Sequence, residues 1–328
     1  MDKPRLSISC ITYNHAKYIR QALEGFVMQQ TNFPFVVLIH DDASTDGTAD
    51  IIREYEAKYP DIIKPIYQTE NQWSKKVNVS IFNFSRIQSE YVAFCEGDDY
   101  WTDPLKLQKQ VDFLDSHPDY TVCFHKAKVF FDEAPENSWT YPSDEYCKGR
   151  TDFTIDDLFE KNFTTTASLV FRWAIPQLFP MENLADGILP YDWYLLHLHA
   201  NFGKIHMLND VMSVYRRQPG GIWQSNFYVQ YGDKHYRFFD EVNKVYNYKY
   251  NVKIKALQNF FLKKVIAESI ATNNFQALQN ITNLPLQSLD FPNKIIIPAK
   301  EYNLKRKIIN KISKLLGCGS VFLPSDWV

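Results

Sequence analysis

Two pairs of adjacent aspartates are the residues of this sequence best suited to chemistry. Asp41-Asp42 and Asp98-Asp99 each follow a short apolar run that is typical of a buried strand. Because ligands of open α/β sheets bind beyond the carboxyl ends of the strands, we expect both pairs to reach one crevice. Acidic turns after strands also serve as plain helix caps, so neither pair by itself decides between a cap and a functional site.

The pair Asp98-Asp99 favours binding of a divalent cation. Adjacent carboxylates in a crevice repel one another, and they gain most when a cation lies between them and an anionic ligand. Two carboxylates suit Mg²⁺ or Mn²⁺ shared with a diphosphate better than they suit a closed zinc cage. Such a cation would neutralise a leaving diphosphate.

Strand and helix patterns alternate in the part of the chain that carries these aspartates. Apolar, β-rich runs predict strands at residues 6–12, 35–39, 63–67 and 91–95. Apolar residues at helical spacing and capping signals predict helices at 19–27, from the turn after Asp42 to about Tyr59, at 77–88, and from Asp103 onward. This alternation predicts an α/β fold with a mostly parallel, Rossmann-like central sheet.

The rest of the chain continues less regularly. We expect strands at 120–131, 168–172 and 211–215, helices at 154–162 and 191–202, and a polar excursion at 132–150. Beyond about residue 225 the strand signals fade, which predicts a helical C-terminal extension. The expected division is a catalytic domain at 1–225, with a nucleotide-sugar half at about 1–105 and an acceptor half at about 106–225, and a helical region at 226–328.

Composition argues against several other classes of protein. The 328 residues carry 36 basic and 38 acidic side chains, a net charge of −2, so no global field attracts nucleic acid. The five cysteines form no CxxC pair of the kind that marks zinc or redox sites. With no signal segment and no run of about 18 apolar residues, we expect a cytoplasmic protein with at most peripheral contact with the inner face of the membrane.

Five short motifs, taken in order, resemble those of a known family. They are residues 9–15 (SCITYNH), 41–48 (DDASTDGT), 96–99 (EGDD), 191–193 (YDW) and 215–216 (YR). This series is similar to the family-2 inverting glycosyltransferases of GT-A fold, over roughly the first two-thirds of the chain. The resemblance implies transfer of a sugar from a UDP-sugar to a hydroxyl of a glycan or glycolipid acceptor, in bacterial surface polysaccharide biosynthesis.

The resemblance also implies roles for individual residues on the donor side. Asp42 would accept a hydrogen bond from the nucleobase, Asp98 would lie by the ribose and metal, and Asp99 would coordinate the metal. Arg216 would meet the diphosphate. The loop after the first strand would contact the nucleotide through Thr12, Tyr13 and Asn14.

On the acceptor side, Asp192 matches the general base that takes the proton of the acceptor hydroxyl. Without the resemblance, Asp192 would be interpreted as a helix cap. The family often has a histidine two positions after the arginine, where this chain has Gln218. Two alternative functions remain, a sugar-nucleotide nucleotidyltransferase and a non-catalytic glycan-binding protein, although the former normally has a glycine-rich loop that is missing after the first strand.

Two further groups of residues are candidates for contacts. A ring could stack on a sugar face at Trp73, Trp101, Trp193 or Trp223, although core packing is the more common use of such rings. Trp101, two residues after Asp99, is the preferred candidate for a sugar contact. Basic residues from Lys300 to Lys314 alternate with apolar ones, a pattern equally typical of a helix at an anionic membrane surface and of one docked on the protein.

Overall fold

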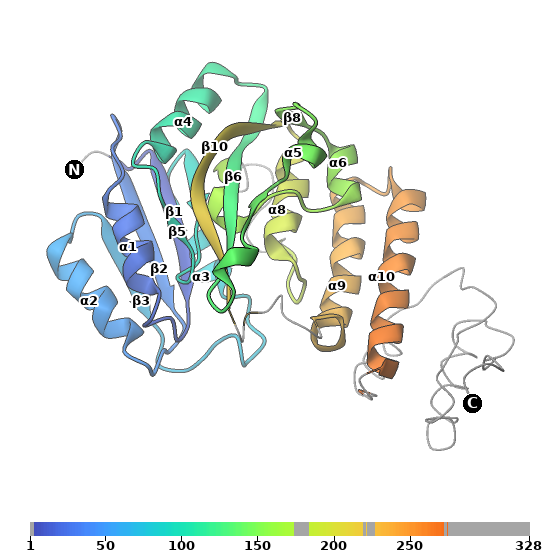
Figure 1. The fold of residues 1–328 in the computed structure, drawn as a ribbon, viewed down its shortest axis with the longest axis horizontal. Coiled ribbons are helices and arrows are strands. Elements are labelled where there is room, and N and C mark those ends of the chain that lie inside the picture. The colour runs from blue at the N-terminus through green and yellow to red at the C-terminus, as the bar shows by residue number, and fades with distance from the viewer. Residues whose placement is uncertain (1–2, 174–183, 219–220, 222–226, 272–273, 275–328) are drawn as a thin grey trace, which may run out of the picture. The chain divides into compact units, whose positions relative to one another are not determined.

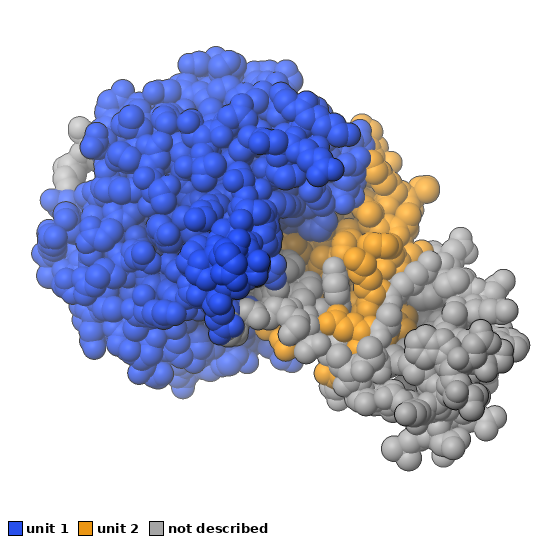
Figure 2. All heavy atoms as spheres, in the orientation of Figure 1, with its two compact units in different colours: residues 1–187, 192–221 blue, residues 188–191, 222–328 orange. Residues whose placement is uncertain are grey.

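The computed structural model describes residues 3–173, 184–218, 221, 227–271 and 274. The chain divides into two compact units, shown in Figure 2. Unit 1 comprises residues 1–187 and 192–221, and unit 2 comprises residues 188–191 and 222–328. Every candidate site residue that the structure describes belongs to unit 1.

The described strands of unit 1 form one ten-stranded sheet (Figure 1). They are β1 (Leu6–Thr12), β2 (Phe35–Asp41), β3 (Ile63–Tyr67), β4 (Tyr91–Phe94), β5 (Tyr100–Trp101), β6 (Tyr120–Phe131), β7 (Trp139–Tyr141), β8 (Asp152–Phe153), β9 (Val170–Arg172) and β10 (Lys204–Arg217). The order is β3-β2-β1-β4-β9-β6-β10-β5, with β7 paired to β6 and β8 to β10. Strands β1 to β4 are parallel to one another, as are β6 and β10, which confirms the predicted mostly parallel sheet.

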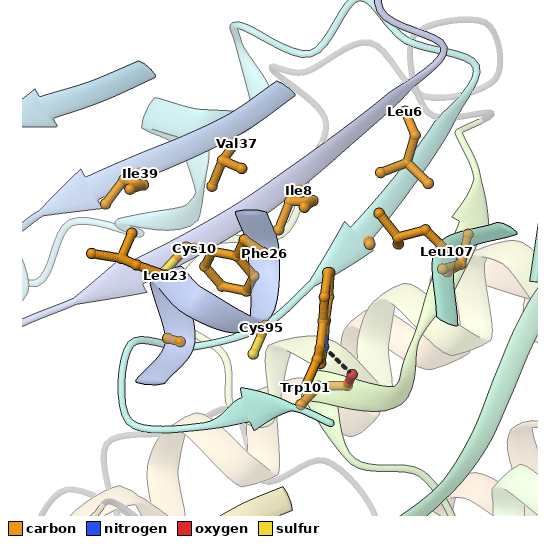
Figure 3. Packing of buried hydrophobic residues seen from close by; sticks show 14 of the residues in the cluster. Leu6, Ile8, Cys10, Leu23, Phe26, Val37, Ile39, Cys95, Trp101 and Leu107 are labelled. Atoms are coloured by element: carbon orange, nitrogen blue, oxygen red, sulfur yellow. Dashed lines mark hydrogen bonds between the residues drawn. The ribbon is translucent and has the colours of Figure 1, made fainter. Parts of the chain in front are cut away.

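Helices cover both faces of the sheet. They are α1 (Ile19–Val27), α2 (Thr48–Lys58), α3 (Ser80–Phe84), α4 (Lys106–Ser116), α5 (Asp144–Cys147), α6 (Ile155–Glu160) and α8 (Tyr191–Ala200), with 3-10 turns at Pro135–Asn137 and Thr166–Ser168. On one face, Leu23 and Phe26 of α1 and Leu107 of α4 pack against Ile8 and Cys10 of β1 (Figure 3). These alternate β1 residues point to one face, and α3 covers the other.

Helix α3 is tied to the sheet by one buried amide. The Asn83 side chain donates to the Ser9 hydroxyl (3.2 Å) and to the backbone carbonyls of Cys10 and Leu38 (3.0 Å each). A buried amide with its donors paired fixes the position of the helix that carries it. The helix predicted at 77–88 spans only Ser80–Phe84. The Asn83 amide attaches this short helix to strands β1 and β2.

Several boundaries differ from the sequence prediction. The strand predicted at 211–215 is the end of the longer β10, and the expected excursion after β6 contains β7 and α5. The strand predicted at 120–131 is confirmed. The two-residue strand β5 was not predicted, because a pair of residues is too short to show alternation.

Unit 2 contains two long helices, as the fading strand signals predict. These are α9 (Phe227–Val245) and α10 (Asn251–Ala271), which pack on each other. A Cβ atom on Gly232 would lie 2.7 Å from a Val265 methyl group, so glycine permits their close approach. Among the described residues, no helix is long and apolar enough to cross a membrane. The basic segment from Lys300 to Lys314 lies outside the described residues, and its membrane contact stays a prediction.

Candidate active site

The turn that carries Asp98 and Asp99 lies against the end of β1. It follows β4, and the Gly97 N–H donates to the Ile11 carbonyl (3.0 Å). A Cβ atom on Gly97 would lie only 2.4 Å from the Thr12 hydroxyl oxygen and 2.7 Å from the Thr12 Cβ. Only glycine fits this approach, so Gly97 brings the acidic turn to the loop that the motifs assign to nucleotide binding.

Asp99 presents a buried carboxylate with one unused oxygen. Its side chain is 1% exposed, and Oδ1 accepts the backbone N–H of Arg216 (2.8 Å). Oδ2 has no hydrogen-bond partner among the described residues. Burial, followed by the charges of Asp98 and Glu96, raises the pKa of Asp99 well above its ordinary value. A divalent cation would satisfy this oxygen and offset the crowded charge, so the residues fit the predicted metal.

Asp98 lies beside two side chains that meet its carboxylate. Oδ2 accepts a hydrogen bond from the Gln218 side chain (2.8 Å) and lies 3.9 Å from His15 Nε2. Gln218 therefore reaches the acidic turn from the position where the family often has histidine. In the described part of the chain, no group of three or more His, Cys, Asp or Glu side chains is placed to hold a metal. A metal shared with a diphosphate needs fewer protein ligands than that.

Arg216 holds the acidic turn in place. Its Nε donates to the Asp98 carbonyl (2.9 Å), Nη1 to Asp132 Oδ1 (2.8 Å) and Nη2 to Gln21 Oε1 (2.6 Å). The side chain is buried, and its guanidinium lies 4.6 Å from the centre of the Tyr18 ring. This geometry gives Arg216 a holding role. The diphosphate contact inferred from the motifs stays a prediction.

Asp132 and Gln21 were not identified from the sequence. Asp132 accepts Lys17 Nζ (2.9 Å) and the Tyr18 hydroxyl (2.8 Å) in addition to Arg216. Burial alone would raise the pKa of Asp132, but these three hydrogen bonds outweigh it and lower the pKa to about 2. Because the partners are remote in sequence, no local pattern could reveal this cluster.

The loop after β1 is shaped by its neighbour after β2. Asn14 has a left-handed backbone (φ 54°), and its side-chain oxygen accepts the Thr45 N–H (2.8 Å) while its N–H donates to the Ser44 hydroxyl (2.9 Å). Thr12 is buried. Tyr13 is 44% exposed, which makes it the member of the predicted nucleotide loop with an open ring.

The two aspartates after β2 differ in their hydrogen bonds. Both carboxylate oxygens of Asp42 accept backbone N–H groups, from Gln72 (2.7 Å) and Trp73 (3.0 Å). Asp42 therefore orders the loop after β3, and its contact with a nucleobase stays a prediction. Asp41 Oδ1 is buried without a partner among the described residues, and burial raises the pKa of this carboxyl.

Asp192 lies in the first turn of α8. Its Oδ2 accepts the side-chain N–H of Asn162 (3.1 Å). Burial raises the pKa of Asp192, and hydrogen bonds from the Trp193 backbone and from Asn162 oppose this effect only in part. A raised pKa makes a carboxylate a stronger base, as proton abstraction requires.

Glu96 links Asp192 to the acidic turn. The Glu96 side chain is exposed at its surface. The protein groups packed around its carboxyl, followed by the charges of Asp98 and Asp192, raise the pKa of that carboxyl. Two carboxylates that both act on Glu96 must lie near it. Glu96 therefore lies within electrostatic reach of both Asp98 and Asp192, and a shared site for the metal and the base stays a prediction.

Trp101 and Trp193 are buried and do not offer the open ring that was predicted for a sugar contact. Trp101 is 2% exposed, and its indole N–H donates to the Ala167 carbonyl (2.8 Å), while its ring packs edge-on against Phe26 (Figure 3). It is a core residue, and the prediction that it stacks on a sugar is wrong. Trp193 is buried on α8 and leaves almost none of its ring to solvent, so it is corrected in the same way. Trp223 lies outside the described residues.

Comparison with known proteins adds a family to this geometry. The sequence model of "Glycosyl transferase family 2" matches residues 7–220. An uncharacterized protein of Mycobacterium tuberculosis is 44% identical over 227 residues, which is 68% of this chain and 61% of that protein. The poly(ribitol-phosphate) beta-N-acetylglucosaminyltransferase TarS of Staphylococcus aureus is 25% identical over 230 residues, 69% of this chain and 38% of TarS. The chain thus spans about 61% of the length of the mycobacterial relative and less of TarS.

Solved structures share the fold. S. aureus TarS 1-349 in complex with UDP-GlcNAc superimposes with a TM-score of 0.57 at 19% identity, covering 85% of this chain and 79% of that one. The mannosyltransferase PcManGT of Pyrobaculum calidifontis, in complex with GDP-Man and Mn²⁺, gives a TM-score of 0.51 at 17% identity, covering 86% and 79%. At these identities the likeness shows the fold alone.

Proposed function

The chain belongs to glycosyl transferase family 2, and from this premise we propose that it moves a sugar from a UDP-sugar to a hydroxyl of a glycan or glycolipid acceptor in bacterial surface polysaccharide biosynthesis. The family and the fold predicted from the motifs are both confirmed. The donor, the metal, the catalytic base and the acceptor are the parts that we propose.

The nucleotide of the donor is proposed to lie on the loop after β1. Tyr13 offers an open ring for stacking, and the loops around Asn14 and Asp42 are ordered by the hydrogen bonds described above. The S. aureus neighbour was solved with UDP-GlcNAc and with UDP, which supports a UDP-sugar as the donor.

The acidic turn is proposed to bind the diphosphate through a divalent metal. Asp99 Oδ2 and the carboxylate of Asp98 would hold Mn²⁺ or Mg²⁺, whose positive charge would neutralise the leaving diphosphate. Arg216 keeps the turn in position through its bonds to Asp98 and Asp99. The Mn²⁺ present with the PcManGT neighbour supports this assignment.

Asp192 is proposed to act as the general base of a single displacement. Its carboxylate takes the proton of the acceptor hydroxyl while that oxygen forms a bond to C1 of the donor sugar. The bond from C1 to the diphosphate oxygen breaks, UDP leaves, and the configuration at C1 inverts. Asn162 orients the carboxylate. A positioned base of this kind contributes about 10²–10⁴-fold in rate.

One observation carries the proposal: Asp99 Oδ2 is buried without a hydrogen-bond partner among the described residues, beside the Asp98 carboxylate in the turn that Gly97 brings to the loop after β1. A screen of nucleotide sugars for thermal protection tests it. UDP-sugars with Mn²⁺ should stabilise the chain, by about 2.7 kcal/mol at 100 times the dissociation constant. Protection by no UDP-sugar, or equal protection when EDTA replaces Mn²⁺, would contradict the proposed donor and metal.

A further inference from the structure

An aromatic cluster with one exposed ring lies at the end of β6 and the start of β7. It consists of Trp139 on β7, which is 44% exposed, and Phe131 at the end of β6. The two ring centres are 5.3 Å apart. Strand β10 also pairs with β6, and the guanidinium of its residue Arg217 lies 5.6 Å from the centre of the Phe131 ring. Trp139 is only partly covered by its neighbours, so part of its apolar surface stays open to a ligand.

The register places this cluster on one face of the sheet. Val129 of β6 lies opposite Trp139, and Ala127 lies opposite Tyr141. Residues two apart on a strand, and residues directly opposite across a pair, share a face. Trp139, Tyr141 and Phe131 therefore project from the same side, and the Trp139 ring is about 7 Å along the strand from Tyr141.

That face leads to the proposed base. The Tyr141 hydroxyl donates to the Asn162 carbonyl, and the Asn162 side chain donates to Asp192 (3.1 Å). Burial, followed by the charges of Tyr146 and Asp192, raises the pKa of Tyr141. Tyr141 is thus linked through Asn162 to the carboxylate that would receive the hydroxyl proton, and it shares a strand and a face with Trp139.

We infer that Trp139 and Phe131 form a subsite for the carbohydrate chain of the acceptor, next to the sugar whose hydroxyl meets Asp192. This inference rests on the proposed function, because that function puts the acceptor hydroxyl at Asp192. A chain of sugars leaving that point along β7 reaches Trp139. The flat apolar face of a sugar ring packs on an aromatic ring, while its hydroxyls stay in water.

Glycan binding by purified variants tests the subsite. The full chain, saturated with UDP and Mn²⁺, is applied to an array of purified capsular, teichoic-acid and lipopolysaccharide glycans. Trp139→Ala should weaken retention about tenfold on the glycans that bind the wild type, and Trp139→Phe should restore part of it. The matched control is Phe202→Ala, which removes a ring that is 46% exposed in the turn before β10, at the opposite end of that strand from Arg217.

The outcomes separate this inference from the proposed function. Calorimetric UDP binding should be equal in all four proteins, and its absence from the wild type would contradict the proposed function rather than the subsite. Unchanged glycan retention by Trp139→Ala, or retention of no glycan by the wild type, overturns the subsite. If glycan retention is unchanged and Trp139→Ala instead loses self-association in ultracentrifugation, the subsite is also overturned. The ring would then be a contact between protein copies.

Discussion

Replacement of Arg216 by lysine should destabilise the fold and loosen the acidic turn. The guanidinium makes three side-chain hydrogen bonds, to the Asp98 carbonyl, to Asp132 and to Gln21, at 2.6–2.9 Å. A lysine ammonium is a single point charge and cannot reach three partners arranged around a planar fork. We expect it to keep the ion pair with Asp132 and to lose the other two bonds.

The magnitude follows from those two bonds. Hydrogen bonds from a charged group contribute about 1.5–3 kcal/mol each, so their loss corresponds to about 3–6 kcal/mol. We take the lower bound, about 3 kcal/mol, because the retained charge near Asp132 avoids leaving a buried carboxylate unpaired. Arg20→Lys is the matched control. The Arg20 guanidinium makes two hydrogen bonds to the Glu54 carboxylate, but both of these side chains are about half exposed. An exposed pair of this kind contributes little to stability.

Urea unfolding and calorimetry of UDP binding with Mn²⁺ together decide between two roles for Arg216. If Arg216 holds the turn, Arg216→Lys lowers both the free energy of unfolding and the affinity for UDP. A diphosphate contact alone would weaken UDP binding and leave the free energy of unfolding near that of Arg20→Lys. That second pattern would refute the holding role.

Three other substitutions give separate tests. Gly97→Ala should lower the free energy of unfolding by about 1–3 kcal/mol in urea titrations, because its Cβ would overlap Thr12, and stability equal to the wild type would contradict the close approach. Asp99→Ala should abolish Mn²⁺-dependent UDP binding in calorimetry while the circular dichroism spectrum persists, and wild-type binding would refute the metal assignment. Burial lowers the pKa of Lys106 from 10.5 to about 7, so the unfolded chain binds more protons between those pH values and stability should rise with pH there. Lys106→Met should remove that rise from unfolding free energies measured between pH 7 and 9.5, and an identical pH slope in both proteins would contradict it.

The sequence predicted those parts of the site that depend on a strand and the turn directly after it. Asp98 and Asp99 follow β4, and Asp41 and Asp42 come at the end of β2 and just beyond it, because apolar runs of strand length end at these residues. Parallel strands then carry their carboxyl ends to one edge, so it could be anticipated that both turns meet the end of β1.

Contacts between remote residues could not be anticipated in the same way. Arg216 meets Gln21 across 195 positions of sequence and Asp132 across 84. Such pairs depend on the sheet order, in which β10 and β6 are neighbours, and no local spacing encodes that order.

The error at Trp101 has a different cause. Trp101 was chosen because it lies two residues after Asp99. Nearness along the chain does not decide where a side chain points, because neighbouring residues of a strand point to opposite faces. Tyr100 lies near the Arg216 guanidinium, whereas Trp101 points into the core below Lys106. Because β5 is too short to show a pattern, the sequence could not decide which of the two rings faces the site.

Sugar transfer by Asp192→Asn is the most direct test of the account. Asparagine keeps the shape and can still accept from Asn162, but it cannot take up a proton. With the UDP-sugar that protects best and the glycan that binds best, transfer should fall by about 10²–10⁴-fold while calorimetric UDP-sugar binding stays at the wild-type level. Asp186→Asn, at an exposed aspartate before α8, serves as the control. Transfer by Asp192→Asn at a rate near that of the wild type would show that Asp192 only caps the helix, and would contradict its role as the base.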